Sequence, residues 1–414
     1  MAPRDIDFLL IGGGLAAGNC ATQLRRAGAD GSILLVGREP ELPYDRPPLS
    51  KGYLQGTEDR AAATMHDATW YDDNQIEALT KVSVTGLDLQ SRTATLSTKD
   101  EIRFGQALLA TGANVRRLNA PGAELEGIHY LRVFDNADSI RADAAGKRVV
   151  LIGGSYIASE VAATLTELGS SCTMVMMEPR ALSRTFGHEA AGYFNDLLVA
   201  HGIELHGEEE LDRFEGADGR VTRVIMKSGA VHEADAVVIG AGVTPEVSLA
   251  KRAGLEIGEQ GGVTADSRLQ SSAPGVYVAG DIAEYVSVVN GGRRQRVEHW
   301  DVAFNQGKTA ALNLLGRGVD HDAVPYFFSD LSDWAAIEYV GPAYAWDREI
   351  IRGSFDDAAF TVFYLQGGTV GGALTVGRSG DLQTARRLIA AGTDLGDAAA
   401  QLGDLSTDLE QLGA

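Results

Sequence analysis

The sequence predicts an α/β protein made of two similar parallel-sheet units followed by a C-terminal α+β domain. Residues 6–37 and 147–178 each run from an apolar strand through a glycine-rich turn and a helical segment to a second strand. From residue 322 onward, short apolar runs of strand character precede a single helical segment. Strand–helix–strand units join parallel strands, whereas strands that follow one another directly favour an antiparallel sheet.

The first unit contains "IDFLLIGGGLAAGNCATQLRRAG", in which the turn has the spacing Gly12-x-Gly14-x-x-Ala17. Gly12 permits the tight turn, Gly14 lets the backbone approach a pyrophosphate, and Ala17 keeps helix and strand close. The pyrophosphate is expected at the helix N-terminus, where N–H groups and the helix dipole favour an anion. The expected acid for the adenosine ribose is Glu39, although Arg38 stands beside it. This pattern predicts a Rossmann-like dinucleotide-binding domain.

The second unit, "KRVVLIGGSYIASEVAATLTELGSSCTMVMME", has a degraded form of the same turn, Gly153-Gly154-Ser155, with Ala158 at the third position. Serine adds a Cβ and a hydroxyl where close approach to phosphate is wanted. Two hypotheses follow. Either this unit binds its nucleotide less closely, or the Ser155 hydroxyl serves as an extra phosphate donor.

The residues after the second strand of this unit bear on nucleotide preference. Glu178 is the candidate acceptor for a ribose 2′-hydroxyl, which favours NADH. Arg180 and Arg184 stand close enough in sequence to accept a 2′-phosphate, so NADPH stays an alternative.

Two further features surround these units. The segment "ELPYDRPPLSKGYL", residues 41–54, has neither strand nor helix character, and its prolines predict a stiff loop that presents Arg46 and Lys51 in fixed directions.

The apolar runs "FGQALLATGANVR", "VVIGAGVTPE" and "GVYVAGDIAEY" each end in a small-residue turn. In the last of these, Asp281 after Gly280 fits either a polyol ligand or a helix cap.

Composition narrows the function classes. The net charge of -21 argues against nucleic acid or an anionic membrane as partner. Cys20 and Cys172 are the two cysteines, and they match neither a metal-ligand nor a CxxC spacing, so buried thiols in a reducing compartment and no metal site are expected. No signal-peptide pattern and no apolar run of transmembrane length are visible. These observations predict a cytoplasmic protein.

Seven motifs in order then carry a family resemblance: "IGGGLAAG", "LPYDRPPLSKGYL", "LLATGA", "GGSYIASEVA", "ADAVVIGAGVTPE", "GVYVAGDIAEY" and "VEHWDVAFNQGKTAALNLLG". The chain resembles the FAD-dependent NAD(P)H:ferredoxin reductases of the putidaredoxin reductase type and their relative apoptosis-inducing factor. The resemblance implies the glutathione-reductase-like flavoprotein layout, with a discontinuous FAD-binding domain (1–112 and 243–321). It also implies an inserted NAD(P)H-binding domain (113–242) and a C-terminal domain (322–414). The acidic tail beyond residue 391 is expected to be loosely attached or disordered.

The resemblance also implies roles for single residues. Lys51 is expected near flavin N5 and paired with Glu160, and these two are the candidate catalytic residues. Arg46 is expected at the FAD phosphates or ribityl chain, and Phe328 stands where the family often has tryptophan. The predicted FAD site comprises Gly12, Gly14, Ala17, Glu39, Arg46, Pro47, Lys51, Ala110, Thr111, Gly112, Gly280, Asp281, Glu298, His299, Trp300 and Phe328. The predicted NAD(P)H site comprises Gly153, Gly154, Ser155, Tyr156, Ile157, Glu160, Glu178 and Gly242.

The implied activity is transfer of a hydride from NAD(P)H to FAD and then of single electrons to a [2Fe–2S] ferredoxin that serves an oxygenase such as a cytochrome P450. No cysteine lies in "DRPPLSK", so the electrons must leave the flavin directly rather than through a disulfide. The alternatives are an NAD(P)H oxidase or quinone reductase without a protein partner, and a redox-sensing flavoprotein that resembles apoptosis-inducing factor and turns over slowly.

An acidic ferredoxin needs a local basic patch on this acidic chain. Arg293, Arg294 and Arg296 are the candidate docking residues, and Arg116 with Arg117 forms another basic pair. A solvated basic turn without a partner is the alternative. A monomer or a homodimer is expected.

Overall fold

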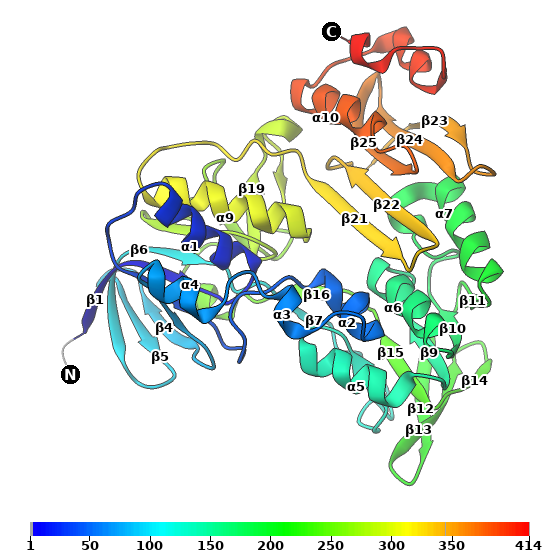
Figure 1. Cartoon of the computed structure of the whole chain (residues 1–414), viewed down its shortest axis with the longest axis horizontal. Helices are drawn as coiled ribbons and strands as arrows, with labels where there is room; N and C mark the ends of the chain where they lie inside the picture. Colours follow the sequence, from blue (N-terminus) through cyan, green and yellow to red (C-terminus); the bar gives the residue numbers. More distant parts are fainter. Residues whose placement is uncertain (1–2, 344, 414) are drawn as a thin grey trace.

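The computed structural model describes residues 3–343 and 345–413, and Figure 1 shows how its sheets and helices are arranged. The first sheet has a parallel centre in the order β3-β2-β1-β6, with β18 also paired to β6, and β5 and β4 extend it by antiparallel pairing. Helices α1 (Leu15–Arg26) and α9 (Trp300–Leu314) lie side by side over this sheet and share its apolar core. Its strands are β1 (Arg4–Ile11), β2 (Ile33–Val36), β3 (Ile76–Leu79), β4 (Val84–Asp88), β5 (Thr93–Leu96), β6 (Glu101–Leu109) and β18 (Val276–Val278).

The second sheet is parallel throughout, in the order β11-β10-β9-β15-β8. Helices α5 (Phe134–Ala144), α6 (Tyr156–Glu167) and α7 (Ser183–Ala200) belong to this unit, and α7 kinks at Gly187. A separate antiparallel sheet, β12-β13-β14, follows in the chain. The strands of these two sheets are β8 (Ile128–Tyr130), β9 (Arg148–Ile152), β10 (Ser171–Val175), β11 (Glu204–His206), β12 (Leu211–Ala217), β13 (Arg220–Met226), β14 (Val231–Glu233) and β15 (Ala236–Ile239).

Short elements connect the two units. Strands β7 (Ala113–Val115) and β16 (Val243–Pro245) pair antiparallel where the chain leaves the first unit and where it returns. The remaining connecting elements are η1 (Pro47–Ser50), α2 (Gly52–Gln55), α3 (Arg60–Ala63), α4 (Ala68–Asp73), α8 (Ser248–Arg252), β17 (Val263–Ala265), β19 (Ala283–Val286), η2 (Val288–Asn290) and β20 (Arg294–Gln295).

The C-terminal part is an antiparallel sheet in the order β21-β22-β25-β24-β23, covered by helix α10 (Asp381–Ala391). Every pairing in it is antiparallel, as expected for strands that follow one another directly. The α/β fold class with two Rossmann-like units and a C-terminal α+β part is therefore confirmed. The strands are β21 (Tyr326–Leu331), β22 (Ala335–Val340), β23 (Arg348–Ser354), β24 (Ala359–Gln366) and β25 (Thr369–Val376).

The expectation of a loosely attached or disordered tail is wrong. Residues 396–403 and 409–411 form the short helices η3 (Gly396–Gly403) and η4 (Leu409–Gln411), whose apolar side chains complete the core under α10. Arg352 and Arg387 donate to backbone carbonyls of the tail, for example Arg387 Nη2 to Leu412 O at 2.7 Å. The acidic composition concealed regularly spaced buried leucines that the sheet covers.

The segment 41–54 also differs from the expected irregular loop. Pro47–Ser50 forms one 3₁₀ turn and Gly52–Gln55 one helical turn. Proline at the start of a helical turn loses no hydrogen bond that it would otherwise make, so the prolines favour these turns. Among the described helices, none is both long enough and apolar enough to cross a membrane.

Candidate functional site

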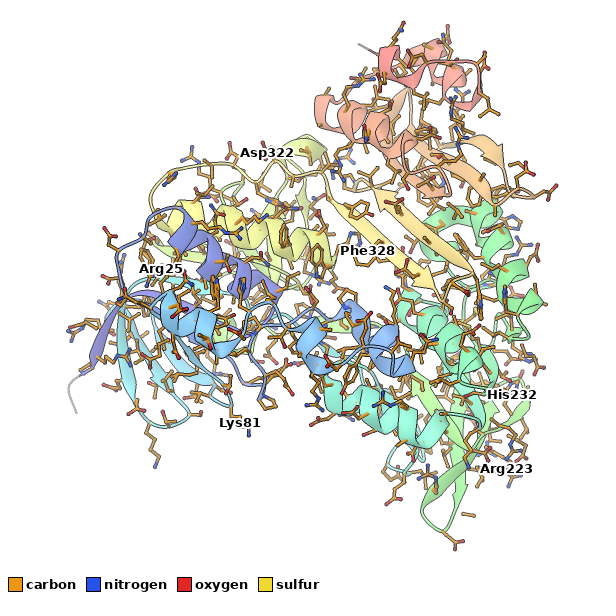
Figure 2. All side chains as sticks on the ribbon, viewed as in Figure 1. Arg25, Lys81, Arg223, His232, Asp322 and Phe328 are labelled. Atoms are coloured by element: carbon orange, nitrogen blue, oxygen red, sulfur yellow. The ribbon has the colours of Figure 1, made fainter. Side chains whose placement is uncertain are left out.

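A cavity of about 930 Å³ lies where the two units and strand β21 meet. Its wall contains the first glycine-rich turn, from Gly12 to Gly14, and the residues from Ser155 to Ile157 that follow the two glycines of the second turn, so residues of both predicted nucleotide sites meet at one space. Figure 2 shows Phe328, which lines it, on β21 near the centre of the molecule. Predicted site residues that line the cavity are Gly12, Gly14, Glu39, Arg46, Pro47, Lys51, Ala110, Thr111, Gly112, Ser155, Tyr156, Ile157, Glu160, Gly242, Gly280, Asp281, Glu298, His299, Trp300 and Phe328.

The first glycine turn has the geometry that the fingerprint predicts. Gly12 has φ +133°, and a Cβ there would lie 2.1 Å from the Ala110 carbonyl oxygen, so only glycine fits. A Cβ at Gly14 would meet nothing within 4 Å, which leaves the backbone open to the cavity. Ala17 lies outside the lining and is fully buried between helix and sheet.

Glu39 is held by Arg46 and Tyr44 instead of standing free. Arg46 Nη2 lies 2.7 Å from Glu39 Oε1, and the Tyr44 hydroxyl donates to Glu39 Oε2 at 2.7 Å. Burial disfavours the charged carboxylate, but Arg46 and Tyr44 outweigh it and hold the pKa of Glu39 below its usual value. The sequence prediction missed Arg132, which lines the cavity and pairs with Asp281 at 3.3 Å.

The ion pair between Lys51 and Glu160 forms across the cavity wall. Lys51 Nζ lies 3.2 Å from Glu160 Oε1 and 4.9 Å from the centre of the Phe328 ring. The prediction missed two neighbours, Ser329 and Asp330. Both directly follow Phe328 in "YFFSD", so the resemblance offered a signal for them.

The start of helix α9 forms another part of the wall. Glu298, His299 and Trp300 line the cavity, so the positive end of the α9 dipole faces it. The Trp300 indole donates to Asp45 Oδ1 at 2.7 Å. His299 Nδ1 is buried and has no hydrogen-bond partner among the described residues, and burial lowers the pKa of His299 to about 4.

The second glycine turn is more closed than the first. Gly153 has φ +118°, and a Cβ there would lie 2.4 Å from the Gly240 carbonyl oxygen. The Ser155 hydroxyl donates to that same carbonyl at 3.1 Å, so this hydroxyl is already engaged within the protein. Gly154 packs against Met176, whose sulfur would lie 2.9 Å from an added Cβ.

The predicted nucleotide-preference residues separate in space. Arg184 lines the cavity, whereas Glu178, Gly153 and Gly154 are not among its lining residues. Arg180 donates to the His188 carbonyl oxygen at 3.2 Å.

The predicted basic patch splits in the same way. Arg294 donates to the carbonyls of Ala265 and Glu284 at 2.9 and 3.0 Å. Arg296 lines the cavity and pairs with Glu298. Arg293 is exposed, as are Arg116 and Arg117.

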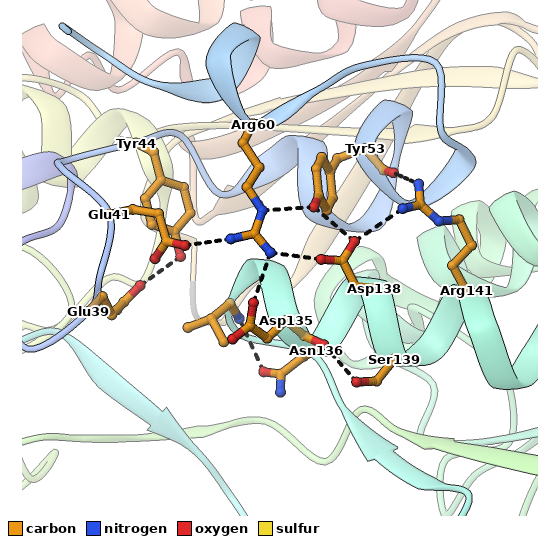
Figure 3. Close-up of polar contacts among 11 residues, drawn as sticks. Glu39, Glu41, Tyr44, Tyr53, Arg60, Asp135, Asn136, Asp138, Ser139 and Arg141 are labelled. Carbon is orange, nitrogen blue, oxygen red and sulfur yellow. Dashed lines mark hydrogen bonds and ion pairs between the residues drawn. The ribbon is translucent and has the colours of Figure 1, made fainter. Parts of the chain in front are cut away.

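A second cluster of ions fixes the segment that carries Lys51. Figure 3 shows Arg60 between the loop after β2 and helix α5, with Nη1 2.8 Å from Glu41 and Nη2 2.8 Å from both Asp135 and Asp138. The Tyr53 hydroxyl donates to Asp138 at 2.8 Å. The segment is therefore anchored to helix α5 of the second unit.

Both cysteines are unpaired and buried, and neither lines the cavity. Burial raises the pKa of Cys20, and it raises that of Cys172 to about 11. Thiols that are buried and protonated at neutral pH are poor nucleophiles, so neither cysteine is placed for exchange with a disulfide.

Comparison with known proteins agrees with this geometry. Residues 6–307 match the model of the pyridine nucleotide-disulphide oxidoreductases, and residues 326–413 match the reductase C-terminal model. The chain belongs to the pyridine nucleotide-disulphide oxidoreductase family. Family membership implies a flavin and a nicotinamide nucleotide as cofactors.

Relatives along the whole length are reductases. Rhodocoxin reductase of Rhodococcus erythropolis is 32% identical over 406 residues, which cover 98% of this chain and 94% of the relative. The ferredoxin–NAD(+) reductase component of the anthranilate 1,2-dioxygenase system of Burkholderia cepacia is 34% identical over 387 residues, 93% of this chain and 94% of the relative.

Two solved structures are similar throughout. A ferredoxin reductase from Rhodopseudomonas palustris superposes with a TM-score of 0.93 at 33% identity, covering 99% of this chain and 100% of that one. The covalent putidaredoxin reductase–putidaredoxin complex gives 0.92 at 30% identity, covering 98% of each chain.

The site fits a flavin. A flavin needs an apolar slot, a phosphate-binding turn and hydrogen-bond partners for its polar edge. The cavity has aromatic walls, an open backbone at Gly14, and an unpartnered buried nitrogen on His299.

Proposed function

We propose that the chain is an NAD(P)H-dependent ferredoxin reductase that contains FAD and supplies single electrons to a [2Fe–2S] ferredoxin of an oxygenase system, such as one with a cytochrome P450. The observation that carries the proposal is the Lys51–Glu160 pair inside one cavity that residues of both predicted nucleotide sites line. Names of the relatives, which include a reductase component of a dioxygenase system, support it.

In this proposal residues 1–112 and 243–321 form the FAD-binding domain, residues 113–242 the NAD(P)H-binding domain, and the chain from 322 the C-terminal domain. The Gly12–Gly14 turn would hold the pyrophosphate, and Asp281 with Arg46 the arm between phosphates and ring. Tyr156 and Ile157, at the start of α6, would border the nicotinamide.

When bound, a flavin accepts a hydride from a nicotinamide and gives up electrons one at a time. The residues of this chain prepare the space for that chemistry. Lys51 supplies a cation fixed by Glu160, the α9 N-terminus supplies a positive dipole end, and Phe328 with Trp300 limits water. No residue of the chain has to form a covalent bond.

For the nucleotide we propose NADH. Because Glu178 lies outside the cavity lining, the preference rests on the ferredoxin–NAD(+) reductases among the relatives rather than on that carboxylate. Arg184 at the cavity wall is the residue that would accept the 2′-phosphate of NADPH.

For docking of an acidic ferredoxin we propose two candidate positions: the exposed Arg293, and the neighbouring cations Arg26 and Lys308. Lys308 lies on α9 with Nζ 3.6 Å from the centre of the Phe304 ring, and Phe304 stacks on Trp300. Burial and the nearby Arg26 cation lower the pKa of Lys308. Surface cations raise the association rate with an anionic partner, and this effect weakens as the salt concentration increases.

The test is rapid mixing of the purified flavin-loaded protein with NADH or NADPH, and then with a [2Fe–2S] ferredoxin. Fast reduction by NADH and fast, salt-sensitive oxidation by the ferredoxin are the expected results. Fast reoxidation by oxygen or a quinone, with no response to ferredoxin, would replace the proposal with an oxidase or quinone reductase. A long-lived complex of reduced flavin and nucleotide, with a change in size, would indicate a redox sensor. Protein purified without flavin would contradict all three.

A further inference from the structure

The Glu160 carboxylate is the point at which three separate segments of the chain meet. Its side chain is 4% exposed, and it accepts from Lys51, from Ser50 and from Ser329. Lys51 Nζ and Ser329 Oγ both approach Oε1, at 3.2 and 2.6 Å, whereas Ser50 Oγ donates to Oε2 at 2.5 Å. Ser50 belongs to η1, Glu160 to α6 and Ser329 to β21.

The two hydroxyl donors are well placed to hold the carboxylate in one orientation. A buried carboxylate needs a donor for each oxygen, and a hydroxyl that donates to a charged oxygen forms a strong bond. Ser50 is 2% exposed and Ser329 is 0% exposed, so almost none of either residue is open to solvent. Thr164, one turn further along α6, donates to the Ser50 carbonyl at 2.7 Å and fixes that side of the arrangement.

Asp330 gives Lys51 a second choice of partner. Its Oδ2 lies 3.5 Å from Lys51 Nζ, and its side chain is 40% exposed. The ammonium group therefore stands between a buried carboxylate that two hydroxyls orient and a solvated carboxylate without that support. Adjacent residues of β21 therefore act on Lys51 in opposite directions. Ser329 supports its buried partner Glu160, whereas Asp330 competes with Glu160 for the ammonium group.

We propose that Ser329 is a positioning residue for the redox site: its hydroxyl fixes Glu160 so that Lys51 stays directed into the cavity instead of turning toward Asp330. The C-terminal sheet thereby sets the position of the central cation rather than only covering the cavity. This inference rests on the proposed function for its kinetic consequence, but not for its geometry.

The test compares Ser329→Ala, Asp330→Asn and the double variant in the full flavin-loaded chain. Loss of a hydrogen bond to a charged group predicts that S329A slows single-turnover flavin reduction by about tenfold. The dissociation constant of NADH is expected to change less than twofold, because the hydroxyl donates to the Glu160 oxygen that pairs with Lys51, and Ser50 still holds the other Glu160 oxygen. D330N alone is expected to stay within twofold of the wild type, and the double variant should regain most of the lost rate, since the competing carboxylate is gone.

A second readout does not depend on activity. The rate at which an amine-specific acylating reagent modifies Lys51, measured by mass spectrometry, should rise in S329A and return toward the wild-type rate in the double variant. Ser271→Ala is the matched control, because Ser271 is also buried and its hydroxyl bonds to the Val276 carbonyl away from the cavity. It should change neither the reduction rate nor the labelling.

Equal effects of S329A and S271A, or absence of recovery in the double variant, would overturn the proposal. If S329A does not fold, Ser50→Ala removes the hydroxyl on the other oxygen and carries the same comparison with D330N. A wild-type protein that neither nucleotide reduces would refute the proposed function, while the labelling comparison would still decide the role of Ser329.

Discussion

The chain makes the same turn at Gly12 and at Gly153. In each turn the glycine N–H donates to the backbone carbonyl oxygen of the last residue of the next strand: Gly12 to Val36 at 2.9 Å, and Gly153 to Val175 at 2.8 Å. The side chains around the two turns differ. The residue after Val36 is Gly37, which leaves the first turn uncovered, whereas the residue after Val175 is Met176, whose thioether packs on Gly154.

The third residue after β2 and the third residue after β10 are both glutamates, but they lie differently with respect to the cavity. Glu39 lines the cavity and is bound by Arg46, whereas Glu178 is not part of the lining. One backbone frame therefore supports an open turn whose neighbouring acid is paired with a cation at the cavity, and a more closed turn whose corresponding acid lies outside the cavity lining. This contrast suits a cofactor that stays bound in the first unit and a nucleotide that leaves the second unit in every cycle.

The largest expected effect tests the part that the turns share. Gly12→Ala and Gly153→Ala should each reduce the free energy of unfolding by about 3 kcal/mol or more, because both positions have positive φ and a Cβ would overlap a carbonyl. Thermal unfolding followed by circular dichroism measures the loss. Gly14→Ala is the control and should cost less than about 1 kcal/mol. Wild-type stability in either of the first two variants would show that the turns do not need glycine.

The two units differ in how strongly a buried histidine makes their stability depend on acid pH. His321, beside Tyr285 and α9, is 2% exposed and its Nε2 has no partner among the described residues, and burial lowers the pKa of His321 from 6.5 to about 4. In the second unit, Asp143 lies 3.0 Å from His129 and offsets part of the burial that lowers the pKa of His129.

His321 binds its proton more weakly in the folded protein than in the unfolded chain. Its contribution to the free energy of unfolding is therefore complete above about pH 6.5 and is lost as the pH falls toward 4. His321→Phe should therefore remove up to about 3 kcal/mol of the pH dependence of unfolding between these values. Urea unfolding at several pH values measures it, with His129→Phe as the comparison. An identical pH dependence of H321F and the wild type would contradict the assignment.

Much of this contrast was predictable from the sequence, because most of its features depend on short stretches of the chain. The fingerprint glycines, the apolar strands and the resemblance predicted both turns, the fold class and the Lys51–Glu160 pair, because each depends on residues close in sequence or on a known motif order. The positions of Glu178 and Arg296 depend on which way a side chain turns after a strand ends, and that of Arg294 on which way it turns from within β20. Sequence spacing does not determine these directions. The packed tail was missed because its leucines are buried in a core that they form together with a sheet and a helix from earlier in the chain.

A moderate effect is expected when the two turns exchange the residue at the second fingerprint position, which is Gly14 in the first turn and Ser155 in the second. Ser155→Gly removes a side chain from the phosphate position, so NADH should bind about fivefold more tightly in calorimetry, corresponding to about 1 kcal/mol. The reciprocal change, Gly14→Ser, places a side chain in space that no residue of the chain occupies, so it should weaken flavin retention and leave the fold intact. Weaker NADH binding by S155G would instead mean that the hydroxyl leaves Gly240 and donates to phosphate.

The smallest effect is expected at Glu178, where the sequence alone would predict a large one. If its carboxylate accepted the ribose 2′-hydroxyl, Glu178→Gln would weaken NADH binding by about tenfold, since a hydrogen bond to a charged group would be lost. Its position outside the cavity lining instead predicts a change below twofold. Arg184→Ala is the matched variant, because Arg184 does line the cavity, and it should weaken NADPH more than NADH. A tenfold loss of NADH affinity in E178Q would mean that the end of β10 moves toward the nucleotide when it binds, and the second turn would then be a site that closes rather than one that is built closed.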